Sequence, residues 1–173
     1  MKHTFSHWQL AGFLFTSILG TFLHFLFDLS GQNPFVALFS AVNESIWEHM
    51  KLLFYPMLLF AFIESRFVGK TCPNFWCVKL VGILLGLVLI PVIYYTYTGI
   101  LGTSADWFNI TIFFIAAGAA YRRETILFQK AYPCRLSPRI ALLTICAIGV
   151  LFTVFTFLPP PIPFFRDASR SAS

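Results

Sequence analysis

Long apolar runs, separated by short polar or basic stretches, follow one another along most of the chain. A helix needs about 20 mostly apolar residues to cross a bilayer. Spanning helices are therefore predicted at residues 8–27, 46–67, 79–101, 105–121 and 140–158. Residues 35–42 are apolar but too few to span, and they predict a short re-entrant or interfacial segment. The pattern predicts an all-α fold, a polytopic transmembrane helix bundle in a single domain over residues 1–165, followed by a polar tail at 166–173.

The composition agrees with a membrane protein and argues against other classes. Apolar residues make up 58% of the 173 residues, and charged residues make up only 11%. An ordinary soluble domain carries about 25% charged residues. These values do not fit a soluble enzyme, a nucleic-acid-binding protein or a disordered chain. The predicted partner is the lipid bilayer, and no nucleic-acid partner is expected.

Basic residues are concentrated in two of the predicted connections, and this predicts the orientation. The second-to-third connection holds Arg66 and Lys70. The fourth-to-fifth connection holds Arg122, Arg123, Lys130, Arg135 and Arg139, whereas the third-to-fourth connection has no lysine or arginine. Because basic loops stay in the cytoplasm, we expect the N-terminus and both basic connections on the cytoplasmic side and the C-terminus outside.

Two further expectations concern the predicted cytoplasmic side. The four cysteines are Cys72, Cys77, Cys134 and Cys146. Their spacing fits neither a zinc site nor a CxxC redox motif, so free thiols are favoured, with a Cys72–Cys77 bridge as the alternative. Glu64 is expected to reach the cytoplasmic surface near Arg66 and Lys70, because long charged side chains extend toward water.

The first predicted helix carries a polar stripe. Ser17, Thr21, His24 and Asp28 follow one another at spacings that place them on one helix face. Helix packing explains the two hydroxyl residues, but an ionisable group in lipid costs about 2.5–3.5 kcal/mol. His24 and Asp28 therefore either bond to each other or form part of a functional site.

The second predicted helix begins with a dense polar stretch. Asn43 or Ser45 is a natural helix cap, and Glu48 and Lys51 can form an ion pair one turn apart. Beyond these local roles, Glu44, Glu48 and His49 place two carboxylates and a histidine beside the polar stripe of the first helix. His24, Asp28, Glu44, Glu48 and His49 form an acidic group with two imidazoles, the composition that a divalent metal ion requires. These five residues are the candidates for both metal ligation and catalysis.

Other polar residues are expected at the same depth, near the outer membrane boundary. We expect the following to bind or orient a substrate: Asn43, Ser45, Lys51, Tyr94, Tyr95, Tyr97 and Asn109. The chain contains no HExxH, GxSxG or DxD motif that would specify a reaction.

Several stretches are distinctive as strings, namely HFLFDLSGQNP, FSAVNESIWEHMKLL, GKTCPNFWCVK, IPVIYYTYTG and FTFLPPPIPFF. Together they resemble a bacterial family of small multi-pass membrane proteins that is catalogued as a domain of unknown function. The resemblance covers Gly20 to Phe165 and implies an integral protein of the bacterial plasma membrane. It implies no particular activity.

Three functions compete at this point. The first is a membrane-embedded, metal-dependent enzyme that acts on a lipid or envelope precursor at the outer leaflet. The second is a small ion-coupled transporter, which would need homo-oligomers because five helices without an inverted repeat are few for alternating access. The third is an accessory membrane subunit. Polar groups at one end favour the enzyme, whereas a polar track that reaches the other end would favour transport.

Overall fold

The computed structural model describes residues 2–102, 106–130 and 133–166. The long helices are α1 (Lys2–Leu29), α2 (Ile46–Phe67), α3 (Phe75–Leu101), α4 (Asp106–Gln129) and α5 (Pro138–Phe157). Short 3-10 turns lie in the connections: η1 (Val36–Leu38), η2 (Gly69–Thr71) and η3 (Pro163–Phe165). The described residues contain no strand, so the predicted all-α fold is confirmed.

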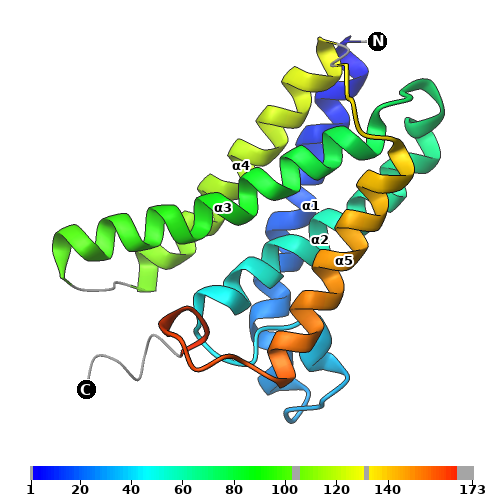
Figure 1. Cartoon of the computed structure of the whole chain (residues 1–173). Coiled ribbons are helices and arrows are strands. Elements are labelled where there is room, and N and C mark those ends of the chain that lie inside the picture. The colour runs from blue at the N-terminus through cyan, green and yellow to red at the C-terminus, as the bar shows by residue number, and fades with distance from the viewer. Residues whose placement is uncertain (1, 103–105, 131–132, 167–173) are drawn as a thin grey trace.

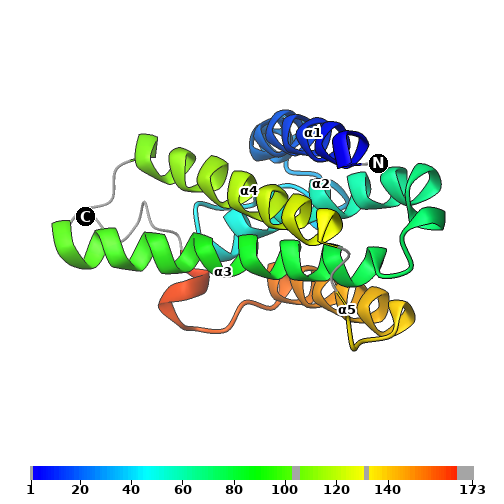
Figure 2. The ribbon, with the colours of Figure 1, turned by 90° about the horizontal axis from the view of Figure 1, so that it is seen from above.

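The helices run back and forth along one body (Figure 1). The start of α1, the 67–75 connection, the end of α4 and the start of α5 lie at one end, which we call the basic end. The 29–46 connection, the end of α3, the start of α4 and the end of α5 lie away from it, on the side that we call the histidine end. Figure 2 shows α1 and α5 on opposite sides of the molecule, with α2, α3 and α4 between them.

Four helices are long and apolar enough to cross a membrane: Phe5–Leu29 of α1, and the whole of α2, α3 and α5. The sequence predicts a fifth span at α4, but Asp106, Arg122, Arg123 and Glu124 shorten its apolar stretch. Large apolar side chains also remain exposed, as on α1, where Leu14, Ile18 and Phe22 face outward. A soluble monomer rarely exposes an apolar surface of this extent. These features indicate a membrane-embedded protein.

Small residues allow α3 and α4 to pack closely. A Cβ atom added to Gly86 would lie 2.7 Å from Leu53 Cδ2 and 3.4 Å from Ala120 Cβ. One turn earlier, a Cβ atom on Gly82 would collide with the carboxylate of Glu124. The facing side of α4 carries small side chains such as Ala116 and Ala120, both fully buried. Small residues spaced in this way are typical of close contacts between membrane helices.

The structure corrects the expectation for two of the cysteines. Cys77, at the start of α3, forms a disulfide with Cys134 in the connection between α4 and α5. The two Cα atoms are 6.4 Å apart, within the usual range for a disulfide. The residues are distant in sequence, so their spacing alone did not indicate the pairing. Cys72 and Cys146 remain free thiols, and burial raises the pKa of the Cys72 thiol.

Candidate metal centre at the histidine end

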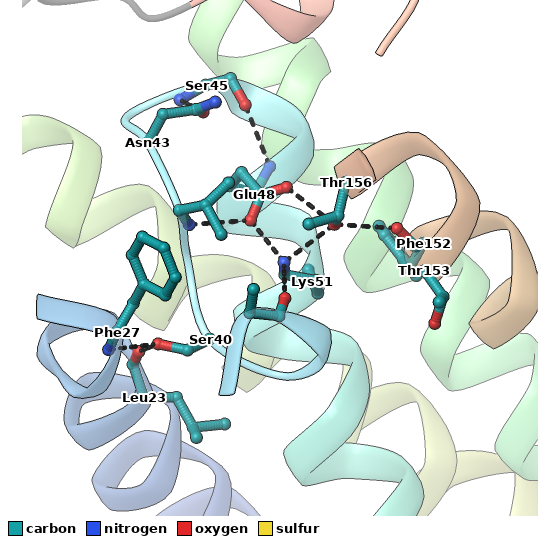
Figure 3. Close-up of polar contacts among 12 residues, drawn as sticks. Leu23, Phe27, Ser40, Asn43, Ser45, Glu48, Lys51, Phe152, Thr153 and Thr156 are labelled. Atoms are coloured by element: carbon teal, nitrogen blue, oxygen red, sulfur yellow. Dashed lines mark hydrogen bonds and ion pairs between the residues drawn. The ribbon is translucent and has the colours of Figure 1, made fainter. Parts of the chain in front are cut away.

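The connection after α1 folds back against the helix that it leaves. Gly31 and Gln32 both have positive φ angles, 68° and 61°, which turn the chain around. Ser40 then fixes the returning segment, because its hydroxyl donates to the Leu23 carbonyl and accepts from the Phe27 backbone N–H at 3.0 Å (Figure 3). The start of α2 is thereby held beside the last turns of α1.

A helix cap determines where α2 begins. The Ser45 side chain accepts a hydrogen bond from the Glu48 backbone N–H at 3.3 Å. The Asn43 side-chain oxygen accepts from the Ser45 backbone N–H at 2.9 Å. This confirms the capping role predicted for the stretch, and it places Asn43 and Ser45 in local hydrogen bonds.

Glu48 and Lys51 form a buried ion pair, which we call the Glu48–Lys51 latch. Their charged atoms are 2.5 Å apart, and the side chains are 2% and 0% exposed. Lys51 also donates to the Ala37 carbonyl at 2.9 Å and to the Thr156 hydroxyl at 3.0 Å. Glu48 accepts from the Val42 N–H at 3.1 Å and from the Thr156 hydroxyl at 3.1 Å (Figure 3). The latch joins the 29–46 connection to α2 and α5.

Three of the five predicted metal-site residues come together between the last turns of α1 and the first turn of α2, with Glu44 just before α2. One Glu44 oxygen lies 3.6 Å from His24 Nε2, and the other lies 3.5 Å from His49 Nε2. One ligand atom from each of the three side chains lies within 4.8 Å of the others. Two ligands of one tetrahedral zinc ion, each about 2.0–2.1 Å from the metal, lie about 3.3 Å apart. The two separations between Glu44 and the histidines are close to that value, each to a different carboxylate oxygen.

The backbone orients one of the two imidazoles. His49 Nδ1 lies 2.9 Å from the Ser45 carbonyl oxygen. Because a carbonyl only accepts hydrogen bonds, Nδ1 carries the proton in this contact. In the neutral ring the lone pair is then on Nε2, the nitrogen that faces Glu44. Histidines that bind metals usually have their second nitrogen fixed in this way.

Asp28 lies outside the group of three. It is exposed in the last turn of α1, whereas the carboxylate described beside His24 Nε2 is that of Glu44. The structure therefore brings together His24, Glu44 and His49 and separates Asp28 and Glu48 from them. The alternative in which His24 pairs with Asp28 is not what the structure shows.

A small pocket adjoins Glu44 and His49. It is lined by Glu44, Ile46, His49, Ile90, Tyr94, Asn109, Ile112 and Phe113. The Tyr97 hydroxyl donates to Asn109 Oδ1 at 2.7 Å and so orients one of the polar lining groups. Tyr95 is 45% exposed on the outside of α3, and Lys51 is enclosed in the latch. Of the predicted substrate-binding residues, Tyr94 and Asn109 are therefore the ones that line the pocket.

A second polar group, at the basic end, was missed by the sequence analysis. Lys79 Nζ lies 2.5 Å from Glu64 Oε2 and 2.6 Å from Glu124 Oε2. Gln9 Nε2 donates to Glu64 Oε1 at 2.6 Å. The expectation that Glu64 reaches the surface is wrong, because Glu64 is fully buried and paired with Lys79. The available signal was the presence of ionisable residues inside predicted membrane helices, which is rare unless they are paired.

Comparisons with known proteins give one match. No similar chain was found among curated proteins or among solved structures. The sequence profile of a family of unknown function, DUF6512, matches residues 1–172. The match covers nearly the whole chain and agrees with the resemblance noted from the sequence motifs. The protein therefore belongs to the DUF6512 family.

Proposed function

We propose that the protein is a membrane-embedded enzyme that uses a divalent metal ion bound by His24, Glu44 and His49. The observation that carries the proposal is the placement of two imidazole Nε2 atoms 3.5–3.6 Å from the two oxygens of one carboxylate. Two histidines and a glutamate are a common ligand set of catalytic zinc, and they leave a fourth position for water or substrate. A metal bound there would lower the pKa of its water and supply a nucleophile at neutral pH.

Two polar groups line the pocket beside Glu44 and His49, which is too small to enclose a headgroup, so we propose that a substrate's polar head meets them at the mouth of the pocket. Tyr94 and Asn109 place a hydroxyl and an amide among the apolar side chains Ile90, Ile112 and Phe113. A lipid or lipid-linked envelope precursor has the matching combination of a polar headgroup and apolar chains. In this proposal Tyr94 and Asn109 hold the headgroup near the metal, and the surrounding bilayer supplies the substrate. A bacterial plasma membrane, with the histidine end outside, is the location that we propose.

Metal binding is the first test. Purified protein is stripped with a chelator, titrated with Zn²⁺, and examined for metal content and thermal unfolding. A ligand that binds only the folded state adds about 2.7 kcal/mol of stability at a hundredfold excess over Kd. We expect this stabilisation in the wild type and its loss in Glu44→Gln and His49→Ala.

Asp28→Asn is the matched control, because Asp28 is an exposed carboxylate near the same end but outside the group of three. It should bind metal as the wild type does. The proposal would be contradicted if the wild type bound no metal and if neither chelator nor Zn²⁺ changed its melting temperature. Retention of the metal by Glu44→Gln would place the site elsewhere.

Activity is the second test. Metal-loaded protein is incorporated into vesicles of phosphatidylethanolamine and phosphatidylglycerol, and released headgroups are measured by mass spectrometry. Release by the wild type and Asp28→Asn, but not by Glu44→Gln, supports a hydrolase. Metal binding without release from these lipids contradicts hydrolysis of a phospholipid headgroup.

Ion-coupled transport is a second candidate, favoured by the buried ionic group at the basic end. Glu64 lies in α2, the helix that carries His49 near its other end, and it pairs with Lys79 of α3, which also pairs with Glu124 of α4. Ionisable groups inside membrane helices commonly mark ion or proton pathways. As a transporter, the protein would still be expected to work as a homo-oligomer. Uptake of Zn²⁺ into vesicles that contain a zinc-sensitive dye distinguishes transport from surface chemistry.

A further inference from the structure

The buried ionic group at the basic end brings together one polar side chain from each of four helices. Gln9 comes from α1, Glu64 from α2, Lys79 from α3 and Glu124 from α4. Each of the four residues is at most 2% exposed. We call this set the Glu64–Lys79–Glu124 cluster. The metal proposal for the histidine end makes no use of it.

The hydrogen-bond donors of the cluster already have acceptors within it. The Lys79 ammonium has three N–H groups, and it meets Glu64 Oε2 at 2.5 Å, Glu124 Oε2 at 2.6 Å and Gln9 Oε1 at 3.5 Å. Gln9 Nε2 donates to the second oxygen of Glu64. The second oxygen of Glu124, Oε1, is buried and has no hydrogen-bond partner among the described residues.

The charges of the cluster do not balance when every group is ionised. Two carboxylates face one ammonium, so the fully ionised cluster would carry one excess negative charge out of contact with water. The neighbouring Arg122 and Arg123 are exposed and do not compensate it. The other titratable groups nearby are Tyr121, whose ring lies 5.5 Å from Lys79 Nζ, and the thiol of Cys72. Neither of them is a cation.

A buried excess charge of this kind is normally neutralised. When two carboxylates share a desolvated site, one of them holds a proton well above its usual titration range. A metal ion is an alternative neutralising ligand, but the unpartnered oxygen packs directly against the α3 backbone at Gly82, where even an added methyl group would collide. A proton adds no heavy atom, so the close packing at Gly82 favours a proton over a coordinated ion at this oxygen.

We propose that the Glu64–Lys79–Glu124 cluster is a buried proton-binding site, in which the two carboxylates hold one proton between them and Glu124 Oε1 is its main position. The cluster is then electrically neutral, with one carboxylate, one ammonium and one carboxylic acid. The proton is exchangeable because the cluster lies one or two turns from the basic ends of α2, α3 and α4. This proposal stands independently of the metal site.

Infrared spectroscopy of the protein in lipid vesicles at neutral pH tests the proposal. A protonated carboxylic acid has a C=O stretching band that a carboxylate lacks, and the band shifts in D₂O. We expect the wild type to show one such band from the cluster. Glu124→Gln should remove it and, as a neutral isostere of the protonated acid, should leave the melting temperature unchanged.

Two further variants keep the test decisive. Glu64→Gln removes the excess negative charge, so the remaining Glu124 should ionise against Lys79 and the band should again disappear. Asp28→Asn is the matched control and should leave the band intact. Absence of the band in the wild type, or its persistence in both glutamine variants, would overturn the proposal. A band that only Glu124→Gln removes would also overturn the sharing of one proton between the two residues.

Discussion

The Glu48–Lys51 latch shows how single residues hold the histidine end in place. Its two charges are buried, and each side chain is also hydrogen-bonded to other parts of the chain through Ala37, Val42 or Thr156. A buried charge that loses its partner is much more costly than the intact pair. Replacing either Glu48 or Lys51 should therefore disturb the position of the 29–46 connection, which contains Glu44.

This gives a prediction for the latch. Glu48→Ala and Lys51→Ala should each lower the free energy of unfolding by about 3–5 kcal/mol, because each leaves a buried charge unpaired. The double variant Glu48→Leu/Lys51→Met removes both charges and should lose less than the sum of the single effects. Denaturant unfolding in mild detergent measures all three. Single losses below about 1 kcal/mol would show that the pair behaves like an exposed one.

At this scale the sequence predicted the local contacts and part of the histidine group, and it missed the partners of Glu64. The Ser45 cap and the pairing of Glu48 with Lys51 follow from spacings of three residues, and both are present. The partners of Glu64 could not be predicted, because Lys79 and Glu124 come from two other helices. The grouping of His24 with Glu44 rather than Asp28 likewise depends on how the 29–46 connection folds back.

At the scale of helices, the apolar pattern predicted where each helix lies in the sequence better than how long it is. The predicted run at 46–67 matches α2, Ile46–Phe67. The run at 105–121 is shorter than α4, Asp106–Gln129, because a helix can continue into polar residues beyond its apolar stretch. The last two turns of α4 carry Glu124, so the part missed by the apolar pattern is also the part that completes the buried cluster.

The contact between α3 and α4 gives a second prediction. Gly82→Ala would force a Cβ atom into the Glu124 carboxylate. Overpacking of a close contact costs about 1–3 kcal/mol, so the variant should unfold at lower temperature. Gly118→Ala in α4 is the control, because its Cβ atom would meet Phe13 Cε2 at 3.8 Å, an ordinary contact. Equal melting temperatures for the two variants would show that α3 can move away from α4.

For the whole molecule, the two indicators of orientation disagree. The basic connections place the N-terminus and the basic end in the cytoplasm. The Cys77–Cys134 disulfide lies at the same end, although disulfides persist mainly in oxidising compartments. The charge pattern involves many residues of the chain, whereas the disulfide depends on one pair, so we retain the cytoplasmic assignment as the prediction.

Reporter fusions test the orientation. A reporter fused after residue 104 should be active outside the cytoplasm, and one fused after residue 130 should be active inside it. Thiol counting checks the disulfide separately, because the denatured protein should yield two alkylatable thiols before reduction and four after it. The reverse reporter pattern would place the basic end outside.

The disulfide has a further consequence for the connectivity of the chain. Cys77 and Cys134 enclose most of α3, the 101–106 connection and all of α4 in one covalent ring. A single protease cut in that connection opens the ring but leaves both pieces attached through sulfur. The oxidised protein should then migrate as one species without reductant and as two fragments with it. A nicked protein of this kind would keep its helices in place, and a single reducing step would release the part of the chain that follows the cut.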